Sequence, residues 1–284
     1  MTPGGAYTWE QAVLWLRSQP EQVDVVRAGY YDDPLLAAAQ RYERSDEWQA
    51  VRGLLPDARA CQALEVGAGR GIVSYALARA GFAVTASEPD GSEIVGAPAI
   101  RRLAGEAHLP IEVIQGYSEQ LPLPSKQFDL VFARAVLHHT SSLERACGEF
   151  FRALKPGGRL IAIREHVISR RQDLAAFLEA HPLHHLYGGE NAFLLREYVH
   201  AIRRAGFPRV RVLSPFANAI NLAPSTPASI LRELAERVSG GSLVLRRALV
   251  TAFVIPGAWA VARTLLRVVD NRPGRLYSFV ATRP

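Results

Sequence analysis

The sequence is poor in cysteine, a residue on which many metal sites and small secreted folds depend. Only two cysteines, Cys61 and Cys147, occur among 284 residues, and they lie too far apart to form a short metal-ligand motif. A disulfide framework and a zinc ribbon are therefore unsupported. Two free thiols in a reducing cytoplasm are expected instead.

Lysine is almost absent as well. Lys126 and Lys155 are the two lysines, so arginine supplies nearly all the positive charge behind the net charge of +6. The arginines are spread along the chain, whereas a nucleic-acid-binding surface is usually a basic patch or stripe. We therefore expect no nucleic-acid partner, and favour a small anionic molecule or a membrane surface.

The chain has little that indicates membrane insertion or export. Its apolar run 248–262 has 15 residues, fewer than the roughly 18–20 needed to cross a bilayer, and Pro256 and Gly257 interrupt it. No basic segment precedes the first apolar residues, so we expect no signal peptide and a cytoplasmic location. Peripheral contact with a membrane stays open.

Short apolar, β-branched runs alternate with helical stretches through the middle of the chain. This alternation predicts an α/β fold with a Rossmann-like, doubly wound, seven-stranded sheet. The expected strands are 62–67, 83–89, 111–116, 128–134, 159–165, one within 200–215, and 274–282. The expected units are an N-terminal helical cap (1–60), a core (61–216) with an active-site insert (166–191), a helical insert (217–273) and the last core strand (274–284).

A glycine-rich loop follows the first predicted strand. Its sequence, Gly67-Ala-Gly69-Arg-Gly71, is neither the dinucleotide-binding G-x-G-x-x-G nor a P-loop. Glu65, two positions earlier, would repel a pyrophosphate and suits a cationic ligand. Glu88 ends the second strand, where a carboxylate accepts hydrogen bonds from ribose hydroxyls. S-adenosylmethionine (SAM) offers a ribose and a positive charge without a phosphate.

Four segments in order, "LEVGAGRG", "SEPDG", "GYSEQLPLPSKQFDLVFARAVLHH" and "LKPGGRLIAI", resemble class I SAM-dependent methyltransferases, in particular the small-molecule group. The resemblance covers about residues 60–165. It implies that the methionine end of SAM is lined by Glu65, Gly67 and Gly69, the ribose is bound by Glu88, and the adenine lies at Pro89 and Ser118. It also implies that Arg134 lies beside the cofactor.

Two tyrosines, Tyr117 and Tyr31, stand where the family has other residues or an aromatic cover over the cofactor. Many relatives carry an aspartate where this chain has Tyr117, which would stack on the adenine or close the pocket. An aromatic residue from the N-terminal helices often covers the cofactor, and Tyr31 is the candidate here. A packing role for Tyr31 is the alternative.

Six of the eight histidines fall between residues 138 and 185. Imidazole suits removal of a hydroxyl proton near neutral pH, and His139 directly follows the fourth strand. His184 and His185, with Glu190, are the second choice for a catalytic base. On a helix, His181, His184 and His185 would share one face and could hold a metal. However, Pro182 follows His181 and no H-E-x-x-H pattern is present, so we expect no metal site.

The insert 217–273 combines a capped amphipathic helix with the apolar run. We favour a lid buried against the core, and an interfacial element with arginines at headgroup level is the alternative.

The function expected from these features is that of a SAM-dependent methyltransferase (EC 2.1.1) acting on a small organic acceptor, most simply a hydroxyl of a sugar or specialised metabolite. One alternative is C- or O-methylation of a lipid-linked or quinone-type acceptor at a membrane surface. Another is a non-catalytic SAM-binding protein, and an NAD-dependent oxidoreductase is disfavoured by the glycine spacing. The acceptor, the methylated atom and the oligomeric state stay open.

Overall fold

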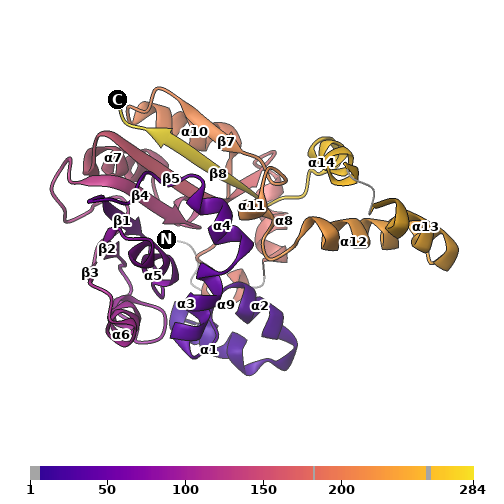
Figure 1. Ribbon diagram of the computed structural model, residues 1–284, viewed down its shortest axis with the longest axis horizontal. Coiled ribbons are helices and arrows are strands. Elements are labelled where there is room, and N and C mark those ends of the chain that lie inside the picture. Colours follow the sequence, from indigo (N-terminus) through magenta and orange to yellow (C-terminus); the bar gives the residue numbers. More distant parts are fainter. Residues whose placement is uncertain (1–6, 182, 254–256) are drawn as a thin grey trace.

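An eight-stranded sheet forms the centre of the protein in a computed structural model, which describes residues 7–181, 183–253 and 257–284 (Figure 1). The strands are β1 (Gln62–Val66), β2 (Ala83–Ser87), β3 (Ile111–Ile114), β4 (Phe128–Arg134), β5 (Leu154–Ile168), β6 (Phe193–Leu194), β7 (Val210–Leu213) and β8 (Arg275–Thr282). Their order is β3-β2-β1-β4-β5-β8-β7, with β6 beside the end of β5. β8 is antiparallel to β5 and β7, and the other pairs are parallel.

The inner strands are apolar on both faces, as expected when helices cover a parallel sheet on both sides. In β1, Ala63 faces one core cluster, whereas Leu64 and Val66 face the other. Neighbouring β4 follows the same alternation, with Phe132 in the first cluster and Val131 in the second. This arrangement fixes the register, because a shift of one residue would exchange the two faces.

Helices cover both faces of the sheet. The first core lies under α3 (Leu35–Glu43), α4 (Asp46–Arg52), α5 (Ile72–Arg79), α6 (Ala97–Ala107) and the short α11 (Ala219–Leu222). The second core lies under α7 (Leu143–Ala153) and α10 (Leu195–Arg204). The predicted doubly wound α/β fold is therefore confirmed, and all seven predicted strands are present. The two-residue β6 is an addition that the sequence analysis did not anticipate.

The remaining helices lie at the carboxyl ends of the parallel strands or outside the core. The N-terminal segment contributes α1 (Trp9–Ser18), the single turn η1 (Pro20–Gln22) and α2 (Val23–Ala28). A second turn, η2 (Leu137–His139), follows β4, and α8 (Asp173–Ala180) and α9 (His184–Tyr187) follow β5. The segment expected to be a helical cap is thus helical in its described part.

The insert before β8 forms three further helices that project from the body (Figure 1). They are α12 (Pro227–Ser239), α13 (Leu243–Phe253) and α14 (Ala258–Val269), called the helical arm below. α12 begins with a capping box at Thr226 and ends at Gly240 in the left-handed conformation, as its sequence predicts.

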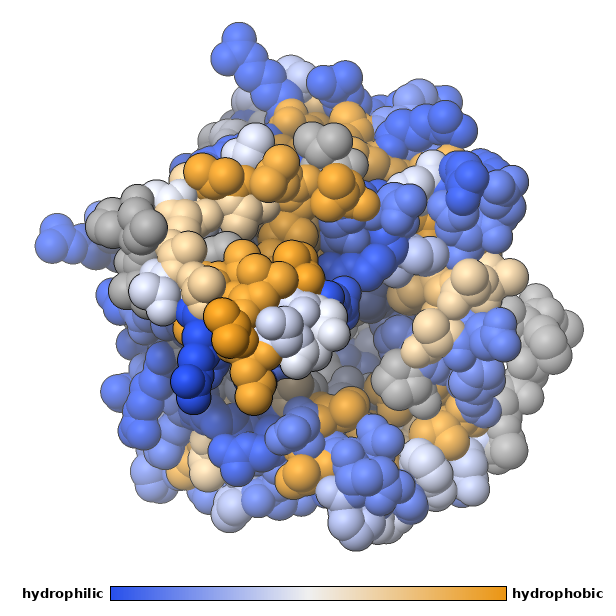
Figure 2. All heavy atoms as spheres, turned by 90° about the vertical axis from the view of Figure 1, so that its right-hand side faces the viewer, coloured by the Kyte–Doolittle hydropathy of each residue, from blue (hydrophilic) through white to orange (hydrophobic). Residues whose placement is uncertain are grey.

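The apolar side chains of the arm are largely exposed. Val244 on α13 is 81% exposed, and Val261 on α14, within the apolar run 248–262, is 64% exposed. α13 and α14 pack on α12 and on each other. Figure 2, which faces the side from which the arm projects, shows apolar residues gathered on this surface. The expected burial of this run against the core is therefore wrong, because the arm extends away from the sheet. A role as a lid stays a prediction.

No helix within the described ranges is both long enough and apolar enough to span a bilayer.

Candidate active site

The glycine loop connects β1 to α5 at the carboxyl edge of the sheet. Gly67, Gly69 and Gly71 have φ of +63°, +54° and +80°, values that favour glycine. A Cβ on Gly67 would lie 2.7 Å from Val136, and one on Gly71 would lie 2.9 Å from Ile100. At Gly69 the same position has no atom within 4 Å. The middle of the loop thus borders open space where a ligand can lie against the backbone.

Glu88 follows β2 and is held between two loops. Its Oε2 accepts a hydrogen bond from the Gly69 N–H at 2.6 Å, and its Oε1 accepts one from the Asp90 N–H at 3.0 Å. Burial raises the pKa of Glu88 to about 7, because its effect exceeds the opposite effect of the two N–H donors, which lower the pKa. Each carboxylate oxygen keeps a lone pair, so the side chain is oriented and can still accept hydrogen bonds from a diol.

Glu65 lies near the end of β1 and is buried. Among the residues that the structure describes, the Ser74 hydroxyl is its side-chain partner and donates to Oε2. Burial raises the pKa of Glu65 to about 8, although the hydrogen bond from Ser74 lowers it. The carboxyl is therefore mostly protonated near pH 7 in the ligand-free protein, and a cationic ligand group beside it would stabilise the ionised form.

Arg70, which the sequence analysis did not single out, joins the glycine loop to the N-terminal segment. Its buried guanidinium donates to the carbonyl oxygens of Tyr30 (3.0 Å), Asp32 (2.9 Å) and Ile94 (3.0 Å), and pairs with Asp33. The N-terminal helices are therefore anchored at the cofactor loop. The sequence shows Arg70 between two glycines but does not show its partners, which lie 24–40 residues away, so its role could not be predicted.

Arg134, predicted to lie beside the cofactor, ends β4 but is directed to α4. Its guanidinium donates to both oxygens of Glu47, at 2.7 and 3.1 Å, and lies over the rings of Tyr30 and Tyr42. Arg164 lies 3.6 Å from the same carboxylate, which is 1% exposed. Against the effect of burial, the two arginines hold the pKa of Glu47 below its ordinary value. Arg134 thus joins the cap to the sheet, and its contact with a cofactor stays a prediction.

Two of the predicted adenine-side residues, Tyr117 and Ser118, lie on the loop after β3, and Pro89 follows β2. The Tyr117 side chain is 69% exposed. The Ser118 hydroxyl donates to Glu119 at 2.7 Å, and Glu119 in turn accepts from Ser141. Pro89, next to Glu88, is half-buried. These positions border the same carboxyl edge as Glu88, and their contacts with adenine stay predictions.

His139 and its buried neighbour His138 form the turn η2 directly after β4. The His138 Nδ1 lies 2.7 Å from Oε2 of Glu165, a carboxylate that also accepts from the backbone N–H groups of Val136 and His138. These donors mark Glu165 as an acceptor, so we assign the Nδ1 proton to His138. Burial lowers the pKa of His138 well below its usual range, so the ring is neutral. The His139 Nδ1 lies 2.9 Å from the Gly189 carbonyl oxygen.

Glu190 lies where the active-site insert meets these histidines. Its Oε2 lies 3.7 Å from the His138 Nε2 and 4.0 Å from the His139 Nε2. Its Oε1 accepts a hydrogen bond from the Tyr187 hydroxyl at 2.7 Å and lies 3.7 Å from the His181 Nδ1. The ring of His166 packs on both His138 and His181. Four histidines, His138, His139, His166 and His181, therefore gather around the buried carboxylate of Glu190.

The second-choice bases lie outside this cluster. His184 and His185 are on α9, and the His185 Nε2 lies 2.8 Å from the Glu179 carbonyl oxygen. His181 is the C-cap residue of α8 and α9 begins at His184, so His181, His184 and His185 do not share one helical face. Of these three histidines, it is His181 whose Nδ1 lies 3.7 Å from Oε1 of Glu190.

The N-terminal cap and the insert pack together over the histidine side of the edge. Trp9 on α1 contacts both Tyr31 and Tyr187, with ring centroids 5.5 and 4.7 Å apart. The Tyr7 N–H donates to the Leu186 carbonyl at 3.1 Å. Burial raises the pKa of Tyr31 to about 12. Tyr31 thus has the packing role that the sequence analysis left as an alternative, and a contact with the cofactor stays a prediction.

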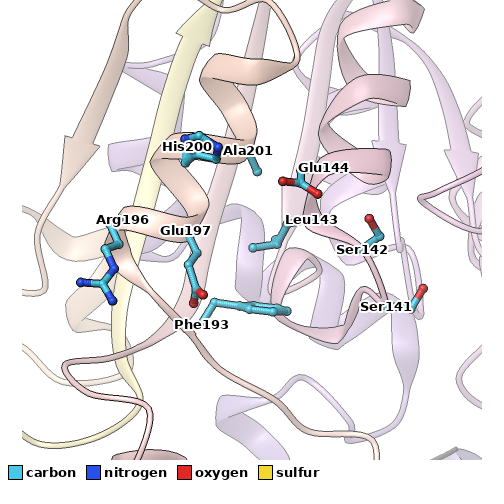
Figure 3. A pocket seen from close by; sticks show the side chains of 9 residues that line it. All are labelled: Ser141, Ser142, Leu143, Glu144, Phe193, Arg196, Glu197, His200 and Ala201. Atoms are coloured by element: carbon cyan, nitrogen blue, oxygen red, sulfur yellow. The ribbon is translucent and has the colours of Figure 1, made fainter.

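Two surface cavities lie apart from these predicted residues. One of about 530 Å³ lies between the N-terminus of α7 and α10, where Leu143, Phe193 and Glu197 point into a common space and Arg196 points away (Figure 3). The other, of about 520 Å³, lies between the N-terminal helices and the segment 219–226. Neither is lined by a predicted cofactor or catalytic residue, so we define the candidate site by its loop geometry.

Comparison with known proteins gives a family match for the core of the chain. Residues 64–162 match the family described as "Methyltransferase domain". The chain is 32% identical over 128 residues to a malonyl-[acyl-carrier protein] O-methyltransferase of Enterobacter lignolyticus, covering 43% of this chain and 48% of the relative. It is 28% identical over 136 residues to a tRNA U34 carboxymethyltransferase of Methylococcus capsulatus, covering 48% and 41%. The chain thus spans less than half the length of these curated relatives.

Among solved structures, the phosphoethanolamine N-methyltransferase 2 of Haemonchus contortus in complex with SAM has the same fold. The TM-score is 0.54 at 18% identity, over 92% of this chain and 59% of the other. This likeness shows the shared fold, and the domain match confirms the predicted class for the core of the chain, residues 64–162.

The buried Glu47 provides a test of how the cap is held. Glu47→Gln removes the charge that Arg134 and Arg164 share, leaving two buried cations without a counter-ion. Breaking such a group costs about 3–5 kcal/mol of unfolding free energy, measured by urea denaturation. Glu43→Gln, which breaks the exposed pair with Arg79, is the control and should cost less than about 1 kcal/mol. Equal losses in the two variants would contradict the assigned role of Glu47.

Proposed function

We propose that this chain, whose core is a class I SAM-dependent methyltransferase domain, transfers a methyl group from SAM to a hydroxyl oxygen of a small organic acceptor, such as a sugar or specialised metabolite. The observation that carries the proposal is a pair of buried carboxylates at the glycine loop, Glu65 two residues before it and Glu88 hydrogen-bonded to the Gly69 N–H, next to open space at Gly69. Glu88 is oriented to accept hydrogen bonds from a ribose diol. Glu65 accepts from the neutral Ser74 hydroxyl, so a cationic group of the ligand can pair with its carboxylate.

The acceptor side is supported by the histidine and carboxylate groups next to the glycine loop. Gly67 contacts Val136, which stands three residues before His139, so the cofactor loop and the turn η2 are neighbours. His139 is half-exposed and reaches Glu190. Polar groups of this kind suit recognition of a hydroxyl, and His139 as its base stays a prediction.

The dispersed arginines favour a small acceptor over a nucleic acid, although one relative carries tRNA in its name. Transfer itself needs no further activation of the methyl donor, because the sulfonium is already electrophilic and positioning supplies much of the rate.

A second candidate acceptor is lipid-linked or quinone-like, with the reaction taking place at a membrane surface. The helical arm favours it, because exposed apolar residues on α13 and α14 lie beside exposed arginines, Arg247 and Arg267. An amphipathic element of this composition binds at the boundary between headgroups and acyl chains.

The ribose assignment predicts a loss of SAM affinity in Glu88→Gln. Replacing the carboxylate removes charge-assisted hydrogen bonds worth about 1.5–3 kcal/mol, or roughly 10–150-fold in Kd by calorimetry. Glu93→Gln changes a neighbouring exposed acid and should leave Kd unchanged. Equal affinity of the Glu88→Gln and wild-type proteins would remove this assignment.

The raised pKa of Glu88 predicts a pH-dependent affinity. In the ligand-free protein the side chain is mostly protonated below about pH 7 and ionised above it. Ribose binding favours the ionised form, so SAM affinity should rise as the pH increases from about 6 to about 8, with proton release below about pH 7. Calorimetry in buffers of different ionisation enthalpy measures that release. Glu88→Gln should flatten the lower part of the profile, and an unchanged profile would contradict the account.

The acceptor class can be tested by transfer of a labelled methyl group from SAM into host extract, separated into aqueous and lipid fractions. Glu88→Gln serves as the blank. Label in the aqueous fraction supports the polar small-molecule acceptor. Label in the lipid fraction supports the membrane-surface candidate instead, and Val244→Ser in the arm should then reduce it. No label above the blank, with SAM binding intact, would leave a SAM-binding protein without this activity.

A further inference from the structure

Two histidines and a carboxylate converge at the end of β4. The Nε2 atoms of His138 and His139 both face Oε2 of Glu190, at 3.7 and 4.0 Å. These separations exceed hydrogen-bond length. They lie close to the roughly 3–3.5 Å that separates two ligand atoms of one divalent ion bound at about 2.0–2.2 Å. The three ligand atoms lie within 4.8 Å of one another, so a small rotation of the side chains brings them to coordination distance.

Both histidines are held with the correct nitrogen free. The His138 Nδ1 donates to the buried Glu165 carboxylate, and the His139 Nδ1 donates to the Gly189 carbonyl. With the proton fixed on Nδ1, each ring presents its Nε2 lone pair towards Glu190. Carboxylates and carbonyls that orient histidines in this way surround most protein metal sites. A purely structural pair of histidines would not need both Nε2 atoms turned to one acceptor.

The charge around Glu190 supports a cation. The carboxylate is 8% exposed, and the described residues place no lysine or arginine within 4 Å of it. Its hydrogen-bond donor is the neutral Tyr187 hydroxyl. On its other side the buried Nδ1 of His181 has no hydrogen-bond partner. A buried carboxylate surrounded by lone-pair donors is stabilised most directly by a bound metal ion.

We propose that His138, His139 and Glu190 bind one divalent transition-metal ion of the zinc class, with coordination positions left open for a ligand. Two histidines and one carboxylate are a ligand set of catalytic metal sites. This replaces the expectation of no metal, which considered His181, His184 and His185. His166 and His181 form a separate group with Glu190, in which the His181 Nδ1 faces Oε1, and are not ligands of this ion.

Resting on the proposed function, the ion deepens it by binding the acceptor oxygen. Coordination lowers the pKa of the hydroxyl, whose proton leaves to solvent. The oxygen lone pair then forms a bond to the methyl carbon, the carbon–sulfur bond breaks, and its electron pair stays on sulfur to give S-adenosylhomocysteine. In this arrangement His139 acts as a ligand and not as the base.

The test uses the purified full chain, stripped with a chelator, dialysed and titrated with Zn²⁺ alone, without SAM. Calorimetry should show one equivalent bound. Co²⁺ in its place should give visible absorption bands of a nitrogen- and oxygen-ligated site. His139→Ala and Glu190→Gln should each weaken Zn²⁺ binding at least tenfold. Glu165→Gln, which releases His138, should weaken it roughly 10–100-fold. His200→Ala, an exposed histidine on α10, is the matched control.

Absence of stoichiometric Zn²⁺ binding would overturn the inference, as would wild-type affinity in His139→Ala and Glu190→Gln proteins whose circular dichroism shows them folded. Loss of binding in His166→Ala with retention in His139→Ala would assign the ion to the other group and overturn it as well. SAM affinity measured on the same stripped protein reports on the proposed function separately. Intact SAM binding without metal binding therefore refutes the ion alone.

Discussion

Burial of carboxylates at the carboxyl edge of the sheet is the constraint on which the rest of the site depends. Five acids there, Glu47, Glu65, Glu88, Glu165 and Glu190, are almost inaccessible to solvent. An unpaired buried carboxylate is costly, so each must find donors or a cation. Two arginines satisfy Glu47, and backbone N–H groups satisfy Glu88 and Glu165. Glu65 accepts from the Ser74 hydroxyl and Glu190 from the Tyr187 hydroxyl, and no arginine or lysine of the described ranges lies within 4 Å of either carboxylate. These two acids mark the places where a ligand cation has most to contribute.

The same interactions explain how the cap, the glycine loop and the insert form one site. Arg70 ties the N-terminal segment to the loop, and Arg134 ties α4 to the end of β4. Trp9 packs against Tyr187 of the insert. The polar groups at the edge are therefore held by elements on three sides, which pre-organises them and lowers the cost of ordering on binding. The helical arm has no part in these contacts, so its exposed apolar surface is available for another role.

The sequence predicted the fold and the cofactor side of the site because their signals are local. Alternating strands and helices, glycines that require positive φ, and acids at fixed distances from strand ends can be read within about ten residues. The histidine–carboxylate cluster could not be predicted, since Glu165 and Glu190 reach His138 and His139 across 27–52 residues. The helical spacing of His181 and His184 does not group them in the structure, because α8 ends at Ala180 and α9 begins at His184. The apolar run of the arm was misread as buried, since hydrophobicity alone does not say what covers it.

A crystal structure of the protein with S-adenosylhomocysteine would test the central claim most directly. The account predicts the ribose hydroxyls within hydrogen-bond distance of Glu88, the backbone of Gly69 against the ligand, the amino group near Glu65, and the sulfur directed towards the turn η2. A ligand bound in another cavity, or a ribose without contact to Glu88, would contradict the assignment of this edge as the cofactor site.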